Sequence, residues 1–252
     1  MRLLTFLFII ALAFTSTFAQ NKSNDSEATK QLYKLFDEVW ENVLKENPTF
    51  ASSLGDKRYN DKWSDNSLAA YERRHKTDIA TLAKINKIDR SKLSVSDQLN
   101  YDLFKKDYEQ SIESFKFKSY LLPINQRGGI QTANGLANSL RFNEVKDYND
   151  WLTRLKTFPS QMNQTIARMK EGKRLKIMWA KKVLERVPNQ IDSQIVKNPE
   201  DSPFFKAFKK CIEIEFHITK ITIQWLNTLV KTSEVQSLIR FYTRYFLQSE
   251  LA

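Results

Sequence analysis

Two histidines are the side chains in this chain best suited to binding zinc or to moving protons at neutral pH. A zinc site needs at least three ligands, and two of them commonly lie one helical turn apart, as in HExxH. Neither His75 nor His217 has a second histidine three or four residues away. His75 also lies among Arg73, Arg74 and Lys76, whose charges would oppose a cation. We therefore expect structural or surface roles for both histidines and no metal ligand in this chain.

The residues that could act as a nucleophile or cradle a phosphate also lack the patterns that such chemistry needs. Cys211 is the only cysteine, so no intrachain disulfide can form, and nothing in its local sequence indicates an activated thiol. There is no Gly-x-Ser-x-Gly elbow, and Gly128 and Gly129 do not have the spacing of a phosphate loop. No pair of carboxylates is set in an apolar surrounding that would shift a pKa. The sequence predicts no catalytic residue.

One loop-like segment combines polar side chains with flexible backbone. Residues 121–130 read LLPINQRGGI, so an apolar half that can anchor to a core precedes amides, a guanidinium and two glycines. The candidate substrate-binding residues are Asn125, Gln126, Arg127, Gly128 and Gly129. At the level of the sequence, ligand contact and simple loop closure explain this pattern equally well.

A second segment, residues 47–63, places an Asx-type turn, a glycine and the aromatic side chains of Tyr59 and Trp63 in one connection. We interpret it as a connector between helices that Tyr59 and Trp63 anchor. A binding role is the alternative, because loops often carry functional residues.

Apolar residues at helical spacing predict the elements that must position these segments. The i, i+3, i+4, i+7 pattern predicts a helix over 25–47, ended by Pro48, and two more that begin after Ser67 and Ser94, which are candidate N-caps. A polar, turn-rich connection should fill residues 49–66. The third helix is expected to bury one apolar face, formed by Leu99, Leu103, Phe104, Tyr108, Ile112 and Phe115.

Helical spacing returns in the second half of the chain. It predicts a helix from Tyr148 to Gly172 that continues past Pro159, and another over 179–196 with a kink at Pro188. The expected fold class is therefore all-α, an irregular helical array with long connecting loops, of which residues 116–146 form the longest.

The sequence changes character after Lys210. From Ile212 to Ile223, isoleucines and one phenylalanine largely alternate with polar residues, which is the period of a strand, yet no second strand is predicted with which it could pair. We therefore divide the chain into residues 1–19, a helical region over 20–210 and an atypical segment over 211–252.

Composition and charge limit the classes of partner. The 252 residues are 41% apolar and carry a formal charge of +11, which removal of Arg2 with residues 1–19 would reduce to +10. The basic clusters are short, are interleaved with apolar residues at helical spacing and accompany no nucleic-acid motif, so we expect solvated helix faces and no nucleic-acid partner.

The N-terminus predicts export. Arg2 precedes the apolar run from Leu3 to Phe14, which is shorter than the roughly 20 residues that span a bilayer, and small residues stand at the −3 and −1 positions before Gln20. We expect a signal peptide over residues 1–19, cleavage after Ala19, and a periplasmic or extracellular protein with no stable membrane span. A retained N-terminal anchor helix is the alternative.

Four stretches of the chain together resemble a bacterial secreted family known as domain of unknown function 885. They are the ASSLGDKRYNDKW, LNYDLF and LPINQRGG motifs and the stretch from Lys170 to Gln190, and the likeness runs from about Phe36 to Lys210. The family is similar to helical zinc metallopeptidases. The resemblance implies a mainly helical, peptidase-like fold in which these residues form one wall of a substrate cleft, with Asn125 to Gly129 facing it.

The resemblance covers only the N-terminal half of the family, whose HExxH-type helix lies in the C-terminal half. No position here matches the metal ligands, so zinc is expected only in a full-length relative, together with a peptide substrate. We expect an incomplete portion of the larger fold, inactive alone, that arose by a frameshift or truncation near Lys210. A genuine short form remains an alternative for the gene, and an extracytoplasmic helical binding or interaction module remains an alternative for the function.

Overall fold

The structure is a computed structural model that describes residues 26–209. Within this range it contains α-helices and 3₁₀-helices but no strand, apart from one isolated bridge between Asn125 and Gly128. The prediction of an all-α fold is confirmed. The predicted signal peptide, Cys211, His217 and the strand-like run from Ile212 to Ile223 lie outside the described residues.

Three long helices make up the first half, and each begins at a serine cap. They are α2 (Glu27–Glu46), α4 (Leu68–Ile85) and α5 (Val95–Phe115). The hydroxyls of Ser26, Ser67 and Ser94 accept hydrogen bonds from backbone N–H groups three residues on, at 3.1 to 3.2 Å. Each bond satisfies one of the amide donors that a helix start leaves without a partner. The predicted starts after Ser67 and Ser94 are confirmed.

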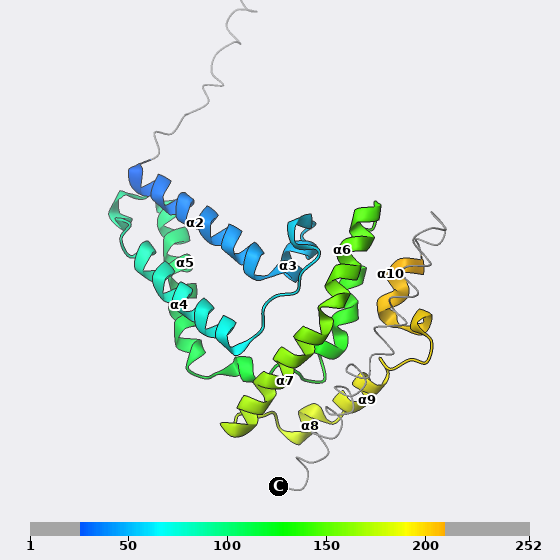
Figure 1. The fold of residues 1–252 in the computed structure, drawn as a ribbon. Helices are drawn as coiled ribbons and strands as arrows, with labels where there is room; N and C mark the ends of the chain where they lie inside the picture. Colours follow the sequence, from blue (N-terminus) through cyan, green and yellow to red (C-terminus); the bar gives the residue numbers. More distant parts are fainter. Residues whose placement is uncertain (1–25, 210–252) are drawn as a thin grey trace, which may run out of the picture.

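The three helices meet at one end, and toward the other end α2 separates from α4 and α5, which stay packed on each other. Leu32 and Leu35 of α2, Ile85 of α4 and Tyr101 of α5 share one hydrophobic core, which Ile88 and Leu93 of the connection between α4 and α5 complete. From this core α2 and α4 splay apart, as Figure 1 shows, so their far ends do not close on each other. The 3₁₀ turn η2 (Arg90–Lys92) joins α4 to α5 beside the core.

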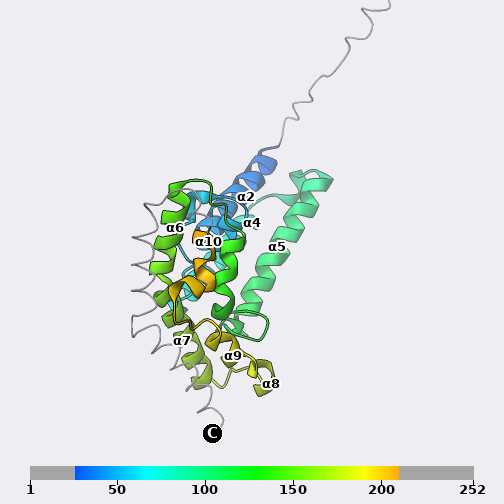
Figure 2. The ribbon, with the colours of Figure 1, turned by 90° about the vertical axis from the view of Figure 1, so that its right-hand side faces the viewer.

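The predicted apolar face of α5 is only partly correct. Phe104 packs on the core of the first three helices, but Leu99 and Leu103 remain 59% and 54% exposed. Tyr101, which the apolar pattern did not include, is buried instead. Figure 2 shows the reason, because α5 forms one edge of the molecule while α6, α7 and α10 lie toward the other edge. A helix at an edge buries the side that its neighbours cover, even where apolar residues extend beyond that side.

Prolines divide helices that the sequence pattern joined. Pro48 follows α2 as predicted, but it also begins a short helix, α3 (Pro48–Ser53), which precedes η1 (Lys57–Tyr59) in the connection expected to be polar and turn-rich. The predicted helix through Pro159 is two helices, α6 (Val145–Lys156) and α7 (Phe158–Arg174). Proline has no N–H to donate, so it suits the first turn of a helix, where no acceptor is available.

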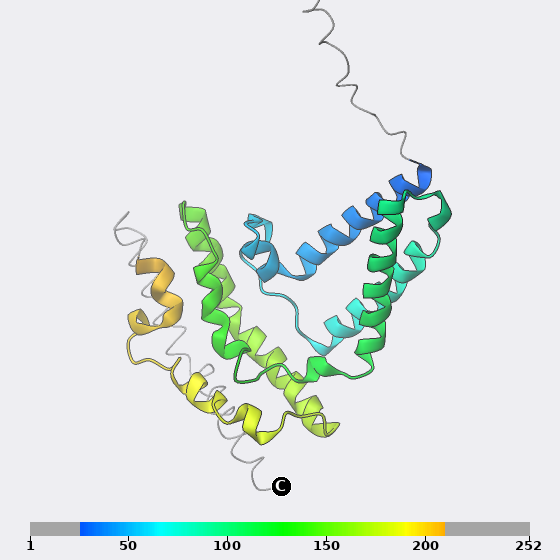
Figure 3. The ribbon, with the colours of Figure 1, turned by 180° about the vertical axis from the view of Figure 1, so that it is seen from behind.

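The remaining elements are short. They are η3 (Ser119–Leu121), η4 (Ile130–Asn138), α8 (Lys181–Leu184), α9 (Val187–Asp192), η5 (Pro199–Asp201), η6 (Pro203–Phe205) and α10 (Lys206–Lys209). The kink expected at Pro188 is a break between α8 and α9. Figure 3 shows α8, α9 and α10 following one another along the outside of α6 and α7. Two further cores hold this half together, one around Trp151 and Phe205 and one around Ile124, Met162 and Val187.

The sequence suggested that Gly172 ends its helix, but the structure shows that it does not. It lies inside α7, which continues to Arg174 and is followed by Lys176 in a left-handed conformation, at φ 60°. A Cβ on residue 172 would lie 2.8 Å from the carbonyl oxygen of Ile177 and 3.0 Å from that of Leu121. This glycine therefore allows a close approach of backbone rather than a helix stop.

Candidate functional site

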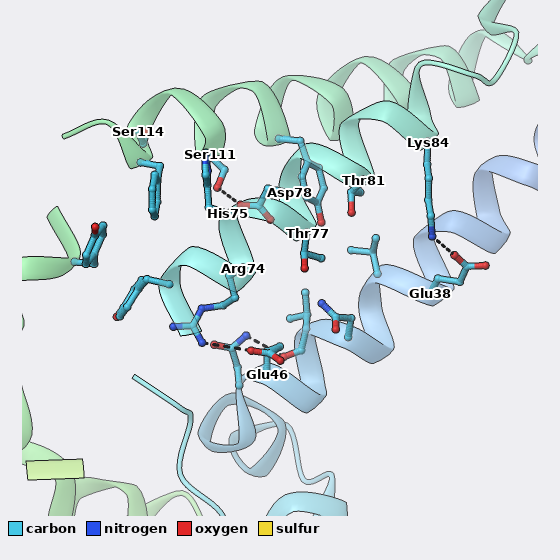
Figure 4. A pocket seen from close by; sticks show the side chains of 18 of the residues that line it. Glu38, Glu46, Arg74, His75, Thr77, Asp78, Thr81, Lys84, Ser111 and Ser114 are labelled. Carbon is cyan, nitrogen blue, oxygen red and sulfur yellow. Dashed lines mark hydrogen bonds and ion pairs between the residues drawn. The ribbon is translucent and has the colours of Figure 1, made fainter. Parts of the chain in front are cut away.

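A groove opens where α2 and α4 separate, with α5 and η3 closing its other side (Figure 4). The cavity has a volume of about 650 Å³. Its charged lining residues are Glu38 and Glu46 from α2 and Arg74, Asp78 and Lys84 from α4, and its aromatic lining residues are Tyr71, His75, Tyr108, Phe115 and Tyr120. The groove thus combines charged groups with ring surfaces.

Both cationic side chains of the lining bind carboxylates across the groove. The Lys84 Nζ lies 3.0 Å from Glu38 Oε2, and this bond lowers the pKa of Glu38. The Arg74 guanidinium lies 3.4 Å from Glu46 Oε2, which also binds Arg73 at 3.0 Å. Arg74 further donates to the backbone oxygen of Asp65 at 2.8 Å. Each of these ion pairs links α2 to α4.

Asp78 is the lining carboxylate that forms no salt bridge among the described residues. Its Oδ2 accepts one hydrogen bond, from the Ser111 hydroxyl on α5, at 2.7 Å (Figure 4). Burial raises the pKa of Asp78 above the ordinary value of an aspartate, and this effect outweighs the lowering by the Ser111 bond and by the nearby His75 and Arg74. The carboxylate is thus partly dehydrated without an ion pair that would compensate.

Four nearly parallel rings line the side of the groove formed by α4, α5 and η3. His75 stacks on Phe115 with centroids 3.9 Å apart, Phe115 on Tyr120 at 5.3 Å, and Tyr120 on Tyr71 at 4.7 Å. The Arg74 guanidinium lies 4.5 Å from the centroid of Tyr71. Stacked rings of this kind form a rigid surface, because the side chains interlock between elements.

His75 is therefore not a simple surface residue. Its ring lies flat on Phe115, and its Nδ1 is buried without a hydrogen-bond partner in the described part of the chain. The expected absence of a metal ligand is not contradicted, since no group of three or more His, Cys, Asp or Glu side chains within residues 26–209 could hold a metal ion. The described residues consequently do not fit a zinc centre.

The five predicted substrate-binding residues lie elsewhere. None of Asn125 to Gly129 lines the groove. Asn125 Oδ1 accepts from the backbone N–H groups of Arg127 at 2.8 Å and Gly128 at 3.2 Å, and the backbones of Asn125 and Gly128 bond to each other.

The rest of this loop is also held by the protein itself. Gln126 donates its N–H to Val183 at 3.3 Å, and its carbonyl accepts from Gln190 Nε2 at 3.0 Å. Gly129 has a φ of +147°, which residues with a side chain rarely adopt. The side chains of Gln126 and Arg127 are exposed. The contacts account for loop closure, and ligand contact stays a prediction.

The segment 47–63 is tied to α6 through a buried arginine. Arg154, which is fully buried, donates from Nη2 to Ser52 Oγ and to the Tyr59 carbonyl, both at 2.8 Å. The indole of Trp63 donates to the Arg154 carbonyl at 2.7 Å. Burial lowers the pKa of Arg154 to about 10. Trp63 thus anchors the connector with its side chain, whereas Tyr59 contributes its backbone oxygen.

The groove could not be predicted from the sequence because its residues match the pattern of a solvated face. Arg74, Asp78, Thr81 and Lys84 recur at helical spacing on α4, which is typical of a surface that faces water. The signal that could have drawn attention is the presence of Tyr71, His75 and Asp78 at intervals of three and four, because such residues share one side of a helix.

The sequence matches the family described as "Bacterial protein of unknown function (DUF885)" over residues 48–241. The match continues beyond Lys210, where the resemblance was expected to end, and begins after α2. No curated protein matches the chain. No helix within residues 26–209 is both long and apolar enough to cross a membrane.

Proposed function

The chain belongs to the DUF885 family, and we propose that residues 26–209 hold a peptide substrate for a zinc-metallopeptidase-like hydrolase. The groove between α2, α4 and α5 is the proposed binding surface. Because the described residues do not fit a zinc site, hydrolysis would need metal ligands from outside this range, and residues 26–209 are proposed to be inactive alone.

The observation that carries the proposal is the lining of the groove. Its volume of about 650 Å³ lies within the roughly 300–1,000 Å³ of most ligand sites. Ring surfaces can contact apolar parts of a peptide, while Asn42, Thr77 and Ser114 offer groups that can bond to its amides. A peptide needs both kinds of contact, because its backbone polar groups must stay hydrogen-bonded when they leave water.

A blocking substitution tests the site. The ligands are capped pentapeptides, acetyl-Ala-Ala-X-Ala-Ala-amide with X varied, titrated calorimetrically into the full chain. Thr77 projects into the groove (Figure 4), and among residues 26–209 its hydroxyl bonds only to its own helix, at the Arg73 carbonyl. Thr77→Trp should therefore fill the groove and weaken binding by at least about tenfold, without breaking a tertiary contact.

Ala80→Trp is the matched control, because Ala80 is an exposed residue of the same helix that does not line the groove. Its affinity should equal that of the unmodified chain. Equal affinity of all three proteins would remove the groove from the proposal. A chelator should not change the binding, since the proposed contacts between the groove and the peptide involve no metal.

The second candidate function is an extracytoplasmic helical binding or interaction module. One observation favours it: within residues 26–209, all the residues that line the groove come from one continuous part of the chain, between Glu38 and Tyr120. A sharp two-state thermal melt of the full chain would support this module, whereas a broad melt with aggregation would support part of a larger hydrolase. Zinc-dependent cleavage of a bound pentapeptide by the full chain would contradict the binding module and would place the metal ligands outside residues 26–209.

We also propose that the protein is exported, on the basis of the sequence of residues 1–19. N-terminal sequencing of the protein recovered from periplasm or medium should give Gln20 as the first residue. Recovery with Met1 intact would favour the retained anchor.

A further inference from the structure

We propose that the groove selects peptides that carry a cationic side chain, and that the Asp78 carboxylate binds its ammonium or guanidinium group. This inference rests on the proposed peptide-binding function and names the class of side chain that the same site prefers.

The first support is the distribution of ion pairs. The lining contains three carboxylates, of Glu38, Glu46 and Asp78, and two permanent cations, of Arg74 and Lys84. Both cations form ion pairs, Lys84 with Glu38 and Arg74 with Glu46, so Asp78 is the carboxylate of the lining that is left without an ion pair. Among the lining residues, carboxylates therefore outnumber permanent cations by one, although the chain as a whole carries a formal charge of +11. That excess attracts a cation and orients it toward Asp78.

The second support is the surrounding of this carboxylate. Asp78 lies one turn after His75, whose ring stacks on Phe115, and close enough to Tyr108 for its charge to raise the pKa of that phenol. Ring faces attract cations, and they also pack against the methylene groups of a lysine or arginine. The aliphatic stem and the charged end of one basic side chain would thus both find a partner.

The third support is the unfavourable dehydration of the Asp78 carboxylate when no ligand is bound. Asp78 is half-buried, dehydration raises its pKa, and the Ser111 hydroxyl together with the nearby His75 and Arg74 offsets only part of this effect. A bound cation would replace the lost hydration with a charge-assisted hydrogen bond, which is among the stronger polar contacts in proteins. A partly dehydrated carboxylate without an ion pair is a poor structural element but a suitable binding group.

An anionic peptide fits less well. To bind Arg74 it would have to compete with Glu46 and with the Asp65 carbonyl, and to bind Lys84 it would have to displace Glu38. It would also bring a second negative charge toward Asp78. The groove therefore favours lysine or arginine over glutamate at the position that reaches Asp78.

The test compares capped pentapeptides that differ at X alone. Lysine is matched with norleucine and arginine with citrulline, so that each pair differs in charge but little in shape. The basic member of each pair should bind the full chain about tenfold more tightly than its neutral match, as expected for a hydrogen bond between charged groups. The glutamate peptide should bind most weakly, and 0.5 M salt should reduce the preference.

Three variants assign the preference to a residue. Asp78→Asn keeps an acceptor for Ser111 but removes the charge, so the lysine and norleucine peptides should bind equally. Ser111→Ala leaves the carboxylate and should keep the preference. Asp192→Asn removes one exposed negative charge from α9, away from the lining residues, and should also keep it. Thermal melts establish that each variant is folded.

The outcomes separate the two proposals. If pentapeptides bind and Thr77→Trp blocks them, but lysine and norleucine bind the unmodified chain equally, the groove stands and the cationic preference is wrong. A tighter glutamate peptide, or a lysine preference that survives in folded Asp78→Asn, would also overturn the role of Asp78. If no pentapeptide binds at all, both proposals fail. The comparison on the unmodified chain needs no variant, so it decides the preference even if Asp78→Asn does not fold.

Discussion

The loop at Asn125–Gly129 and the groove at Asp78 both hold polar groups, but they use them in opposite ways. In the loop, the Asn125 side chain binds the amides of its own turn, and the Gln126 backbone binds α8 and α9. In the groove, the Asp78 carboxylate has a single hydroxyl partner and faces a cavity. The loop that looked like a binding site has its bonds already made, whereas a helix that looked like a solvated face carries a group without an ion pair.

This difference follows from where backbone hydrogen bonds are available. A loop leaves its amides without helical partners, so nearby asparagines and glycines satisfy them and create a conspicuous sequence pattern. A helix satisfies its own backbone, and its polar side chains stay free for other contacts. Amides and glycines in a loop are therefore weaker signs of a ligand site than a polar side chain on the concave side of splayed helices.

The largest expected effect is the loss of stability on Gly129→Ala. A Cβ at this position would lie 2.6 Å from Gln131 Oε1 and 3.1 Å from Ile124 Cα, on a backbone with a φ of +147°. We expect the free energy of unfolding to fall by about 2–3 kcal/mol, measured by denaturant unfolding. Affinity for the lysine pentapeptide should not change in the folded protein.

Gly135→Ala is the matched control for that variant, because a Cβ there meets no atom within 4 Å and the φ is not in the left-handed region. Its stability should stay within about 1 kcal/mol of the unmodified chain. A Gly129→Ala protein that is as stable as Gly135→Ala would show that the loop is not held as described.

A smaller effect is expected at Asn125. Asn125→Ala removes the acceptor for the two amides of the turn and should lower the free energy of unfolding by about 1 kcal/mol. Asn125→Asp keeps an acceptor oxygen and should retain most of the stability. If the loop serves closure alone, both variants bind peptides normally, and a selective loss of affinity in folded Asn125→Ala would restore the loop as a ligand site.

A structural feature can be predicted from the sequence when residues close together in the chain determine it. The starts of α4 and α5 follow from Ser67 and Ser94, because a cap bonds to an amide three residues away. The exposure of Leu99 and Leu103 does not follow from the local sequence, because it depends on which neighbouring elements cover α5. The angle between α2 and α4, and with it the groove, likewise depends on a core contributed by residues far apart in the chain.

The smallest expected effect is a gain in stability on Asp78→Asn. The pKa of Asp78 is raised in the folded protein, so the charged form is less favourable there than in the unfolded chain. This lowers stability at pH values above the raised pKa, and the loss disappears as the pH falls toward the ordinary value of an aspartate. Asp78→Asn should thus raise the melting temperature at pH 8, with a smaller difference at pH 4.

Asp78→Asn distinguishes a binding residue from a structural one, because its stability should rise while its preference for lysine is lost. Asp78→Asn is expected to melt slightly higher while it loses the preference for lysine, as for a residue kept for binding at some expense of stability. A lower melting temperature at pH 8 would instead mean that Asp78 is a structural residue.

Photo-crosslinking tests the position of the bound peptide most directly. The lysine pentapeptide is extended with a benzophenone residue, irradiated with the full chain, and the modified residues are identified by mass spectrometry. The adducts should fall on α4, α5 and the second half of α2, and Thr77→Trp should abolish them while Ala80→Trp retains them. Adducts concentrated on residues 125–129 and unaffected by Thr77→Trp would contradict the account.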